Sequence, residues 1–140
     1  EMSGHLFFND RWYGFDDGIY AAARLLEILA ADGRPASAIF ADLPEPVTTP
    51  EIRMDLQEGE PHRLMTALME RAEAFEDAAI TTIDGLRVDF DDGWGLVRAS
   101  NTQPCLVMRF EGTDDAALTR IRERFEALIR TSADATGIIV

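Results

Sequence analysis

Lysine is absent from this chain of 140 residues: all 13 basic residues are arginines, and they are outnumbered by 26 aspartates and glutamates. The net charge of −13 makes nucleic acid and anionic membranes unsuitable partners, because both are repelled by an acidic surface. One cysteine, Cys105, excludes an internal disulfide and fits a reducing compartment, so we expect a cytoplasmic protein. No apolar run approaches the ~20 residues that a membrane span needs.

Several chemical signatures are also missing from the sequence. It contains no P-loop and no nucleophile elbow. The acidic turn at residues 89–92 lacks the ligand spacing of a calcium loop, and His5, His62 and Cys105 do not form a zinc pattern. We therefore expect no metal site in this chain. A hydrophobic content of 46% is nevertheless sufficient for a folded core.

The first part of the chain predicts a loop followed by a helix. Residues 1–15 are rich in glycine and aromatic side chains, which is typical of loop and turn. Asp16 or Asp17 then provides an N-cap, apolar residues recur at helical spacing, and Gly33 ends the helix.

Four prolines mark a linker over residues 34–50, with a short helix expected at residues 36–43. We expect residues 1–46 to be the end of one domain, a loop and helix remaining from an α/β domain. Residues 47–140 are then a second domain, and the linker is a candidate hinge between the two.

The second part predicts an α+β domain, a small antiparallel sheet with two helices on one face. One helix opens at Pro61 and the other is capped by Thr113, and each carries an apolar stripe at helical spacing. Period-two alternation and turn residues predict strands at residues 51–56, 79–83, 86–90, 94–97 and 106–110.

A loop between the last two strands concentrates groups that bind anions. Arg98 offers a guanidinium fork, Ser100 and Thr102 offer hydroxyls, and Asn101 offers an amide, before Pro104 starts the next strand. We predict that Arg98, Ser100, Asn101 and Thr102 bind a phosphate monoester. The alternative is a plain connection in which the serine and asparagine satisfy their own backbone.

The first five residues form a second constellation. Glu1 and Ser3 are suited to binding sugar hydroxyls, and His5 can move a proton near neutral pH. The alternative is a solvated glutamate and a solvated loop histidine without any role.

These two segments together resemble the C-terminal part of a bacterial phosphomannomutase/phosphoglucomutase, of the α-D-phosphohexomutase superfamily. Residues 1–5 resemble the family's sugar-binding loop, and residues 12–18 with the following helix resemble the rest of its third domain. The run Gly93–Thr102, followed by Pro104, resembles the phosphate-binding loop of its fourth domain. The fourth domain of this family is similar to the TATA-binding-protein fold, which agrees with the predicted order of strands and helices.

The resemblance implies a role for each segment in binding a phosphohexose, such as a mannose or glucose phosphate. Glu1 and Ser3 would bind the 3- and 4-hydroxyls of the sugar, and His5 would be a proton-transfer group near the reacting end. The loop Arg98–Thr102 would hold the phosphate that is not transferred. Gln103 departs from the threonine expected there, and we expect its side chain to point outward.

The family's phosphoserine lies in its first domain, and its Mg²⁺ is bound in the second by an Asp-Gly-Asp-Gly-Asp-Arg loop. Neither motif occurs in this sequence, and phosphoryl transfer needs both a positioned nucleophile and a metal. We therefore expect the chain to open inside a longer protein whose other domains are its partners. We expect it to have no cofactor of its own and no mutase activity in isolation.

Two other functions remain open at this stage. A phosphoglucosamine mutase is the nearest one, but Met2 and the run Ala99-Ser100-Asn101 differ from the residues expected in that enzyme. The other is a non-catalytic module that binds anions or another protein.

Overall fold

The computed structural model describes residues 4–140. Contacts between Cα atoms divide the chain into two compact units, one ending at Glu45 and one comprising Pro46–Val140. In the described residues no helix has both the length and the apolar character needed to cross a membrane.

The first unit contains helix α1 (Gly18–Asp32) and helix α2 (Ala36–Phe40). Asp17 is the N-cap of α1, because its Oδ1 accepts the backbone N–H groups of Ile19 and Tyr20, both at 3.0 Å. Gly33 ends the helix at a φ of 76°. Helix α2 is shorter than the predicted 36–43, because the residue before a proline, here Leu43, disfavours helical geometry.

Helix α1 buries none of its residues. Most of its large apolar side chains are exposed to solvent, with Ile19 87% and Leu26 65% exposed, and Leu29 is half-buried. The aromatic residues of the preceding loop pack on its first turn, where the ring of Trp12 stacks on that of Tyr20 with centroids 4.3 Å apart.

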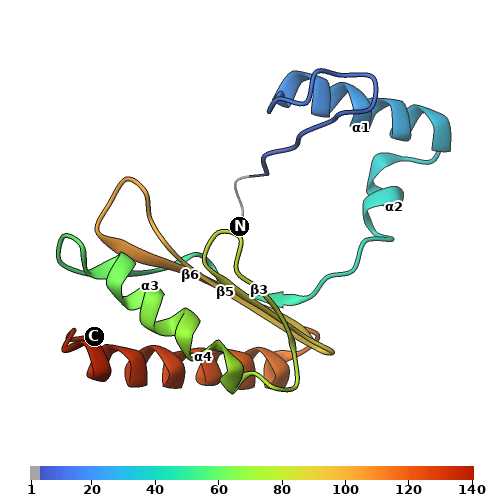
Figure 1. Ribbon diagram of the computed structural model, residues 1–140. Coiled ribbons are helices and arrows are strands. Elements are labelled where there is room, and N and C mark those ends of the chain that lie inside the picture. The colour runs from blue at the N-terminus through green and yellow to red at the C-terminus, as the bar shows by residue number, and fades with distance from the viewer. Residues whose placement is uncertain (1–3) are drawn as a thin grey trace. The chain divides into compact units, whose positions relative to one another are not determined.

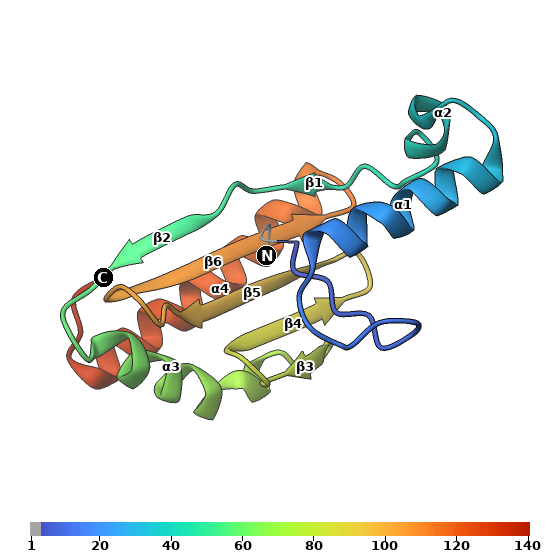
Figure 2. The ribbon, with the colours of Figure 1, turned by 90° about the horizontal axis from the view of Figure 1, so that it is seen from above.

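The second unit is built on an antiparallel sheet in which β6 is central. Strand β6 pairs with β5 on one side and with β1 and β2 on the other, and the order is β1–β6–β5–β4–β3. The strands are β1 (Val47–Thr48), β2 (Ile52–Asp55), β3 (Ala79–Thr81), β4 (Leu86–Phe90), β5 (Gly93–Ala99) and β6 (Cys105–Gly112). Figure 2 shows β2, β6, β5, β4 and β3 side by side.

Helices α3 (Glu60–Glu70) and α4 (Asp115–Thr136) cover one face of this sheet (Figure 1), and a 3₁₀ turn (Ala72–Ala74) follows α3. The predicted α+β fold with two helices on one face is therefore confirmed. The face between sheet and helices is the core, and it is centred on Phe110 and Phe125, which are 1% and 0% exposed.

The glycines of β5 have a packing role at the core. A Cβ placed on Gly95 would come within 2.3 Å of the ring of Phe125, so only glycine lets helix α4 lie this close to the strand. Since Gly95 and Val97 face the core, Arg98 has its side chain on the opposite, helix-free face.

Strand β1 was not predicted, because two residues between prolines carry no readable alternation. Thr49, directly after it, donates its N–H to the carbonyl of Phe110 at 3.0 Å and accepts the N–H of Phe110 on its hydroxyl at 3.1 Å. The end of the predicted 34–50 linker is therefore part of the sheet.

Two predicted helix starts were wrong by one residue. Asp114 caps α4 in place of Thr113, because the Asp114 carboxylate accepts the N–H of Ala117 at 2.8 Å. Helix α3 begins at Glu60, which puts Pro61 at its second position.

The strands flanking the candidate phosphate loop are longer than the predicted 94–97 and 106–110. Pairing continues through Arg98 opposite Val107 and Ala99 opposite Leu106. Arg98, predicted to be a loop residue, is therefore held in a strand.

Candidate functional site

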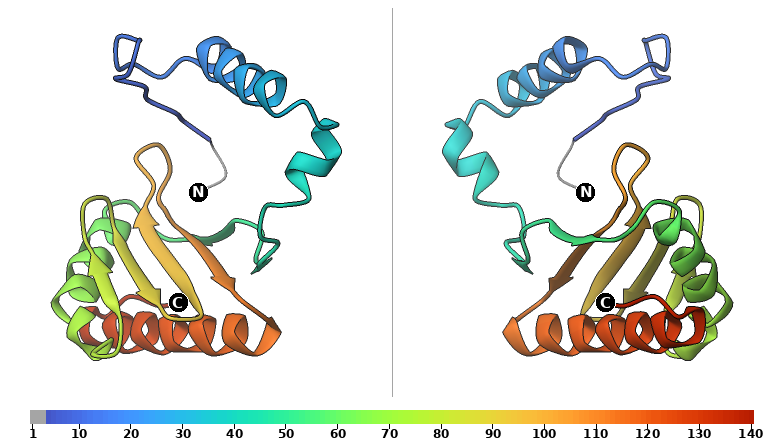
Figure 3. Two further views of the ribbon diagram at one scale, coloured as in Figure 1. Left: turned by 90° about the vertical axis from the view of Figure 1, so that its right-hand side faces the viewer. Right: turned by 90° about the vertical axis from the view of Figure 1, so that its left-hand side faces the viewer.

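The connection between β5 and β6 extends beyond the ends of both strands (Figure 3). Its base is closed by the N–H of Ser100, which donates to the carbonyl of Cys105 at 2.9 Å, and by the N–H of Cys105, which donates to Gln103 at 2.8 Å. The carbonyl of Pro104 accepts the N–H of Leu56 at 2.8 Å. Backbone bonds to two strands thus hold the loop in place.

The Ser100 hydroxyl is the point on which the donors of this loop converge. Its Oγ accepts the backbone N–H groups of Thr102 and Gln103, both at 3.3 Å, and lies 3.4 Å from Oγ1 of Thr102. This is the self-satisfied turn of the alternative interpretation, and it directs two N–H groups and the Thr102 hydroxyl toward the Ser100 oxygen. The two N–H bonds, at 3.3 Å, are long for N–H donors.

Arg98 lies at the end of β5, half-buried, and its Nη1 donates to the carbonyl of Ala99 at 3.3 Å. Ser100, Asn101 and Thr102 line a cavity of about 140 Å³ together with the start of α3, including His62. Arg98 does not line this cavity. The structure thus brings Ser100, Asn101 and Thr102 together at one cavity. Arg98 belongs to β5, and its side chain lies on the helix-free face of the sheet.

Gln103 has a definite partner, although its side chain was expected only to point outward. It is exposed, and its Oε1 accepts a hydrogen bond from Nη2 of Arg53, on strand β2. The same Arg53 nitrogen lies 3.4 Å from the Cys105 sulfur. Arg53 was missed because no local pattern connects residues 50 positions apart.

In the first unit, His5 forms a hydrogen bond through Nδ1 with the carboxylate of Asp16. Both side chains are largely exposed, at 61% and 41%. The pair leaves Nε2 as the ring nitrogen that can contact a ligand, and the carboxylate orients the ring. Asp16 was considered only as a helix cap, so its contact with histidine was missed. Glu1 and Ser3 lie outside the described residues.

Carboxylate and imidazole groups do not gather for metal binding in residues 4–140, where no group of three or more His, Cys, Asp or Glu side chains could hold an ion.

The sequence matches two family profiles in succession. Residues 51–128 match "Phosphoglucomutase/phosphomannomutase, C-terminal domain", and residues 1–47 match "Phosphoglucomutase/phosphomannomutase, alpha/beta/alpha domain III". The chain belongs to the phosphoglucomutase/phosphomannomutase family.

Curated relatives agree with this assignment. A phosphoglucomutase of Neisseria gonorrhoeae is 54% identical over 134 residues, which is 94% of this chain and 29% of the relative. A phosphomannomutase/phosphoglucomutase of Pseudomonas putida is 54% identical over 125 residues, 89% of this chain and 27% of the relative. The chain thus spans less than a third of the length of these relatives.

A solved structure supports the fold as well. The crystal structure of a phosphoglucomutase/phosphomannomutase family protein from Burkholderia thailandensis superimposes with a TM-score of 0.75 at 51% identity, covering 94% of this chain and 27% of that one. A probable phosphoglucosamine mutase of Methanocella arvoryzae is more distant, at 33% identity over 119 residues.

Proposed function

We propose that this chain is the substrate-recognition part of a phosphomannomutase/phosphoglucomutase, which interconverts hexose 1-phosphate and hexose 6-phosphate through a bisphosphorylated sugar. Its loop Arg98–Thr102 binds the phosphate that is not transferred. The observation that carries the proposal is the convergence of two N–H groups and the Thr102 hydroxyl on the Ser100 hydroxyl, beside the end of β5, where Arg98 is the last residue but one. Preorganised donors of this kind are what a phosphate monoester requires.

The first unit contributes recognition of the sugar in this proposal. Glu1 and Ser3 bind the 3- and 4-hydroxyls, and His5 transfers a proton through Nε2 while Asp16 fixes the ring through Nδ1. Asp16 is a positioning residue, because it acts only through the histidine.

Two separate binding segments, one for the sugar hydroxyls and one for the phosphate, suit a reaction in which the bisphosphorylated intermediate must rotate by half a turn. The 3- and 4-hydroxyls can be held in either orientation of the sugar, and the loop accepts whichever phosphate is distal. Neither segment contacts the 2-hydroxyl of the sugar, so both mannose and glucose phosphates can be substrates. The nucleophilic phosphoserine and its Mg²⁺ belong to other domains of the parent, so this chain alone has no mutase activity. Detectable turnover of glucose 1-phosphate by the purified chain would refute that.

In this proposal, the hinge that lets the second unit close on the ligand lies N-terminal to Val47. Residues 47–49 are fixed by β6, so the movable part of the linker is confined to Arg34–Pro46. Closure would remove water from the arginine–phosphate pair and strengthen it.

Titration followed by NMR tests the phosphate role. Mannose 1-phosphate should shift the amide signals of Ser100–Thr102 selectively, and sulfate should shift them less. Arg98→Ala should weaken the affinity for mannose 1-phosphate by about 2 kcal/mol, the worth of a charge-assisted hydrogen bond. Unchanged affinity in Arg98→Ala would remove the phosphate role of this loop. An equal response to sulfate and to mannose 1-phosphate would favour the non-catalytic anion-binding module.

A further inference from the structure

The helix-free face of the second unit carries two arginines around a single residue of β6. Arg53 of β2 and Arg98 of β5 are both directly opposite Val107, one on each side. Neighbouring strands are about 4.8 Å apart, so the two Cα atoms are separated by about 10 Å. Because a guanidinium stands several atoms from its Cα, both groups can reach one anion above this part of the sheet.

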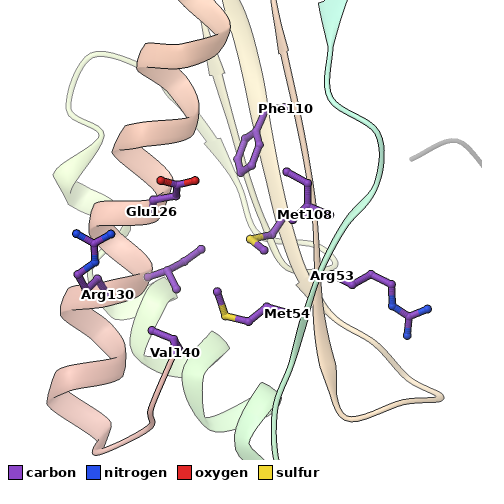
Figure 4. A pocket seen from close by; sticks show the side chains of 9 residues that line it. Arg53, Met54, Met108, Phe110, Glu126, Arg130 and Val140 are labelled. Atoms are coloured by element: carbon purple, nitrogen blue, oxygen red, sulfur yellow. The ribbon is translucent and has the colours of Figure 1, made fainter.

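The direction of the Arg53 side chain is consistent with this placement. Figure 4 shows Arg53 pointing away from the apolar cavity that Met54, Met108 and Phe110 line on the core side. Alternation along β2 thus sends Met54 to the core and Arg53 to the helix-free face.

Gln103 connects Arg53 to the phosphate loop. Its side-chain oxygen accepts from Arg53 Nη2, and its backbone N–H donates to the Ser100 hydroxyl at 3.3 Å. One residue therefore links the second guanidinium to the point where the loop donors converge. Only Nη2 of Arg53 is used in these contacts, which leaves the other donors of its fork for a ligand.

Charge supports the same conclusion. In a chain with twice as many acidic as basic residues, most arginines of the described part have a carboxylate partner, but no carboxylate lies within 4.0 Å of Arg53 there. Asp55 and Glu51, its neighbours along the edge, attract it electrostatically without forming an ion pair. Arg109, two residues beyond Val107 on the same face, has a buried Nη1 without a hydrogen-bond partner in residues 4–140. Arg53, Arg98 and Arg109 thus lie near one another on the helix-free face, with Glu51 and Asp55 at its β2 edge.

We propose that Arg53 is a second guanidinium of the phosphate site, held at the loop by Gln103, so that the phosphate is bound from β2 as well as from β5. This rests on the proposed phosphate role of Arg98–Thr102. The site then presents its ligand with two arginines, on opposite sides of β6, and its preference for dianionic phosphate over monoanionic ligands exceeds what one guanidinium supplies.

Isothermal titration of the whole chain with mannose 1-phosphate at low ionic strength tests this. Arg53→Gln should weaken binding about fivefold to twentyfold, the range for loss of one exposed charge-assisted contact. Arg130→Gln is the matched control, because Arg130 is also exposed, has no carboxylate partner in the described residues and lies on α4 beside the apolar cavity. It removes the same charge and should change affinity less than about twofold.

Two more variants separate the charge of Arg53 from its position. Arg53→Lys keeps the charge and should recover part of the lost affinity. Gln103→Thr removes the tether and should weaken binding about threefold, less than Arg53→Gln, because the charge remains. Circular dichroism and urea unfolding should be unchanged in all of these exposed variants, which excludes a folding defect.

The outcomes distinguish this inference from the function on which it rests. An Arg53→Gln effect no larger than that of Arg130→Gln, together with a large Arg98→Ala effect, overturns the role of Arg53 and leaves the phosphate loop intact. Binding that is insensitive to Arg98→Ala overturns the loop itself.

Discussion

Gly85 lies directly against Arg98. A Cβ on Gly85 would come within 2.6 Å of the Arg98 Cβ and within 2.4 Å of the carbonyl oxygen of Val97, and the glycine has a φ of 92°. The turn before β4 therefore reaches the strand that carries the candidate phosphate ligand, and only a residue without a side chain fits between them.

Gly85→Ala should therefore displace Arg98 and lower the affinity for mannose 1-phosphate about tenfold, since a site loses affinity when its ligands shift by about 1 Å. Titration calorimetry at a temperature where circular dichroism shows a folded protein measures this.

Gly137→Ala is the control for the backbone strain itself. Gly137 also has a positive φ, 70°, but an added Cβ meets nothing within 4 Å. It should lower stability by about 1 kcal/mol, as a left-handed alanine does, and leave phosphate affinity unchanged. Equal affinities of the two variants would show that Gly85 does not position Arg98.

Gly95→Ala should destabilise the second unit by about 1–3 kcal/mol, because its Cβ would enter the space of the Phe125 ring at 2.3 Å. Urea unfolding measures the loss. Adding Phe125→Leu should cost less in the Gly95→Ala background than in the unaltered chain, since the smaller side chain makes room. Strictly additive losses would mean that the two residues are not in steric conflict.

Ser132→Ala should increase stability by about 1 kcal/mol. Ser132 is 0% exposed on α4, and its hydroxyl has no hydrogen-bond partner in the described part of the chain. Alanine removes a buried unpaired polar group and has a higher helix propensity. The urea midpoint should rise, and a fall would indicate that the hydroxyl is paired after all.

Asp77 should contribute stability that depends on pH. Arg124 donates from both terminal nitrogens to its carboxylate, at 2.8 Å each, and these hydrogen bonds lower the pKa of Asp77 below its ordinary value. The contribution is present above the unfolded pKa, about 3.9, and is lost as the pH falls through the lower folded pKa.

The difference in urea midpoint between the unaltered chain and Asp77→Asn should accordingly be larger at about pH 7 than at about pH 2. Asp84→Asn is the control, because Asp84 is exposed and has no ion pair among residues 4–140. A difference for Asp77→Asn that does not change with pH would contradict the role of the pair.

The long helices and the alternating strands could be predicted from the sequence because their patterns are local. Helix α4 repeats its apolar positions over several turns, and the alternation of β2 is regular. Strand β1 could not be predicted, because it exists only through pairing with the distant β6. Long-range pairing with β6 also explains why Arg98, predicted to be in a loop, lies in a strand.

The residues of the candidate site also divide into those that are close together in the sequence and those that only folding brings together. Ser100, Asn101 and Thr102 are neighbours in the sequence, so they could be grouped from it, but the cavity that they share with the start of α3 could not. Arg53 and Asp16 could not be found as partners of Gln103 and His5, because folding alone brings these pairs together.

Helix α1, with Ile19, Leu25, Leu26 and Ile28 exposed to solvent, has a consequence for handling the isolated polypeptide. An exposed apolar surface of this kind favours self-association of the chain. Electrostatic repulsion between molecules that each carry a net charge of −13 opposes it. Salt weakens that repulsion, and acidification toward the isoelectric point near 4.4 abolishes it. We therefore expect the chain to stay monodisperse in dilute, low-salt buffers near neutrality and to precipitate in concentrated salt or in acid.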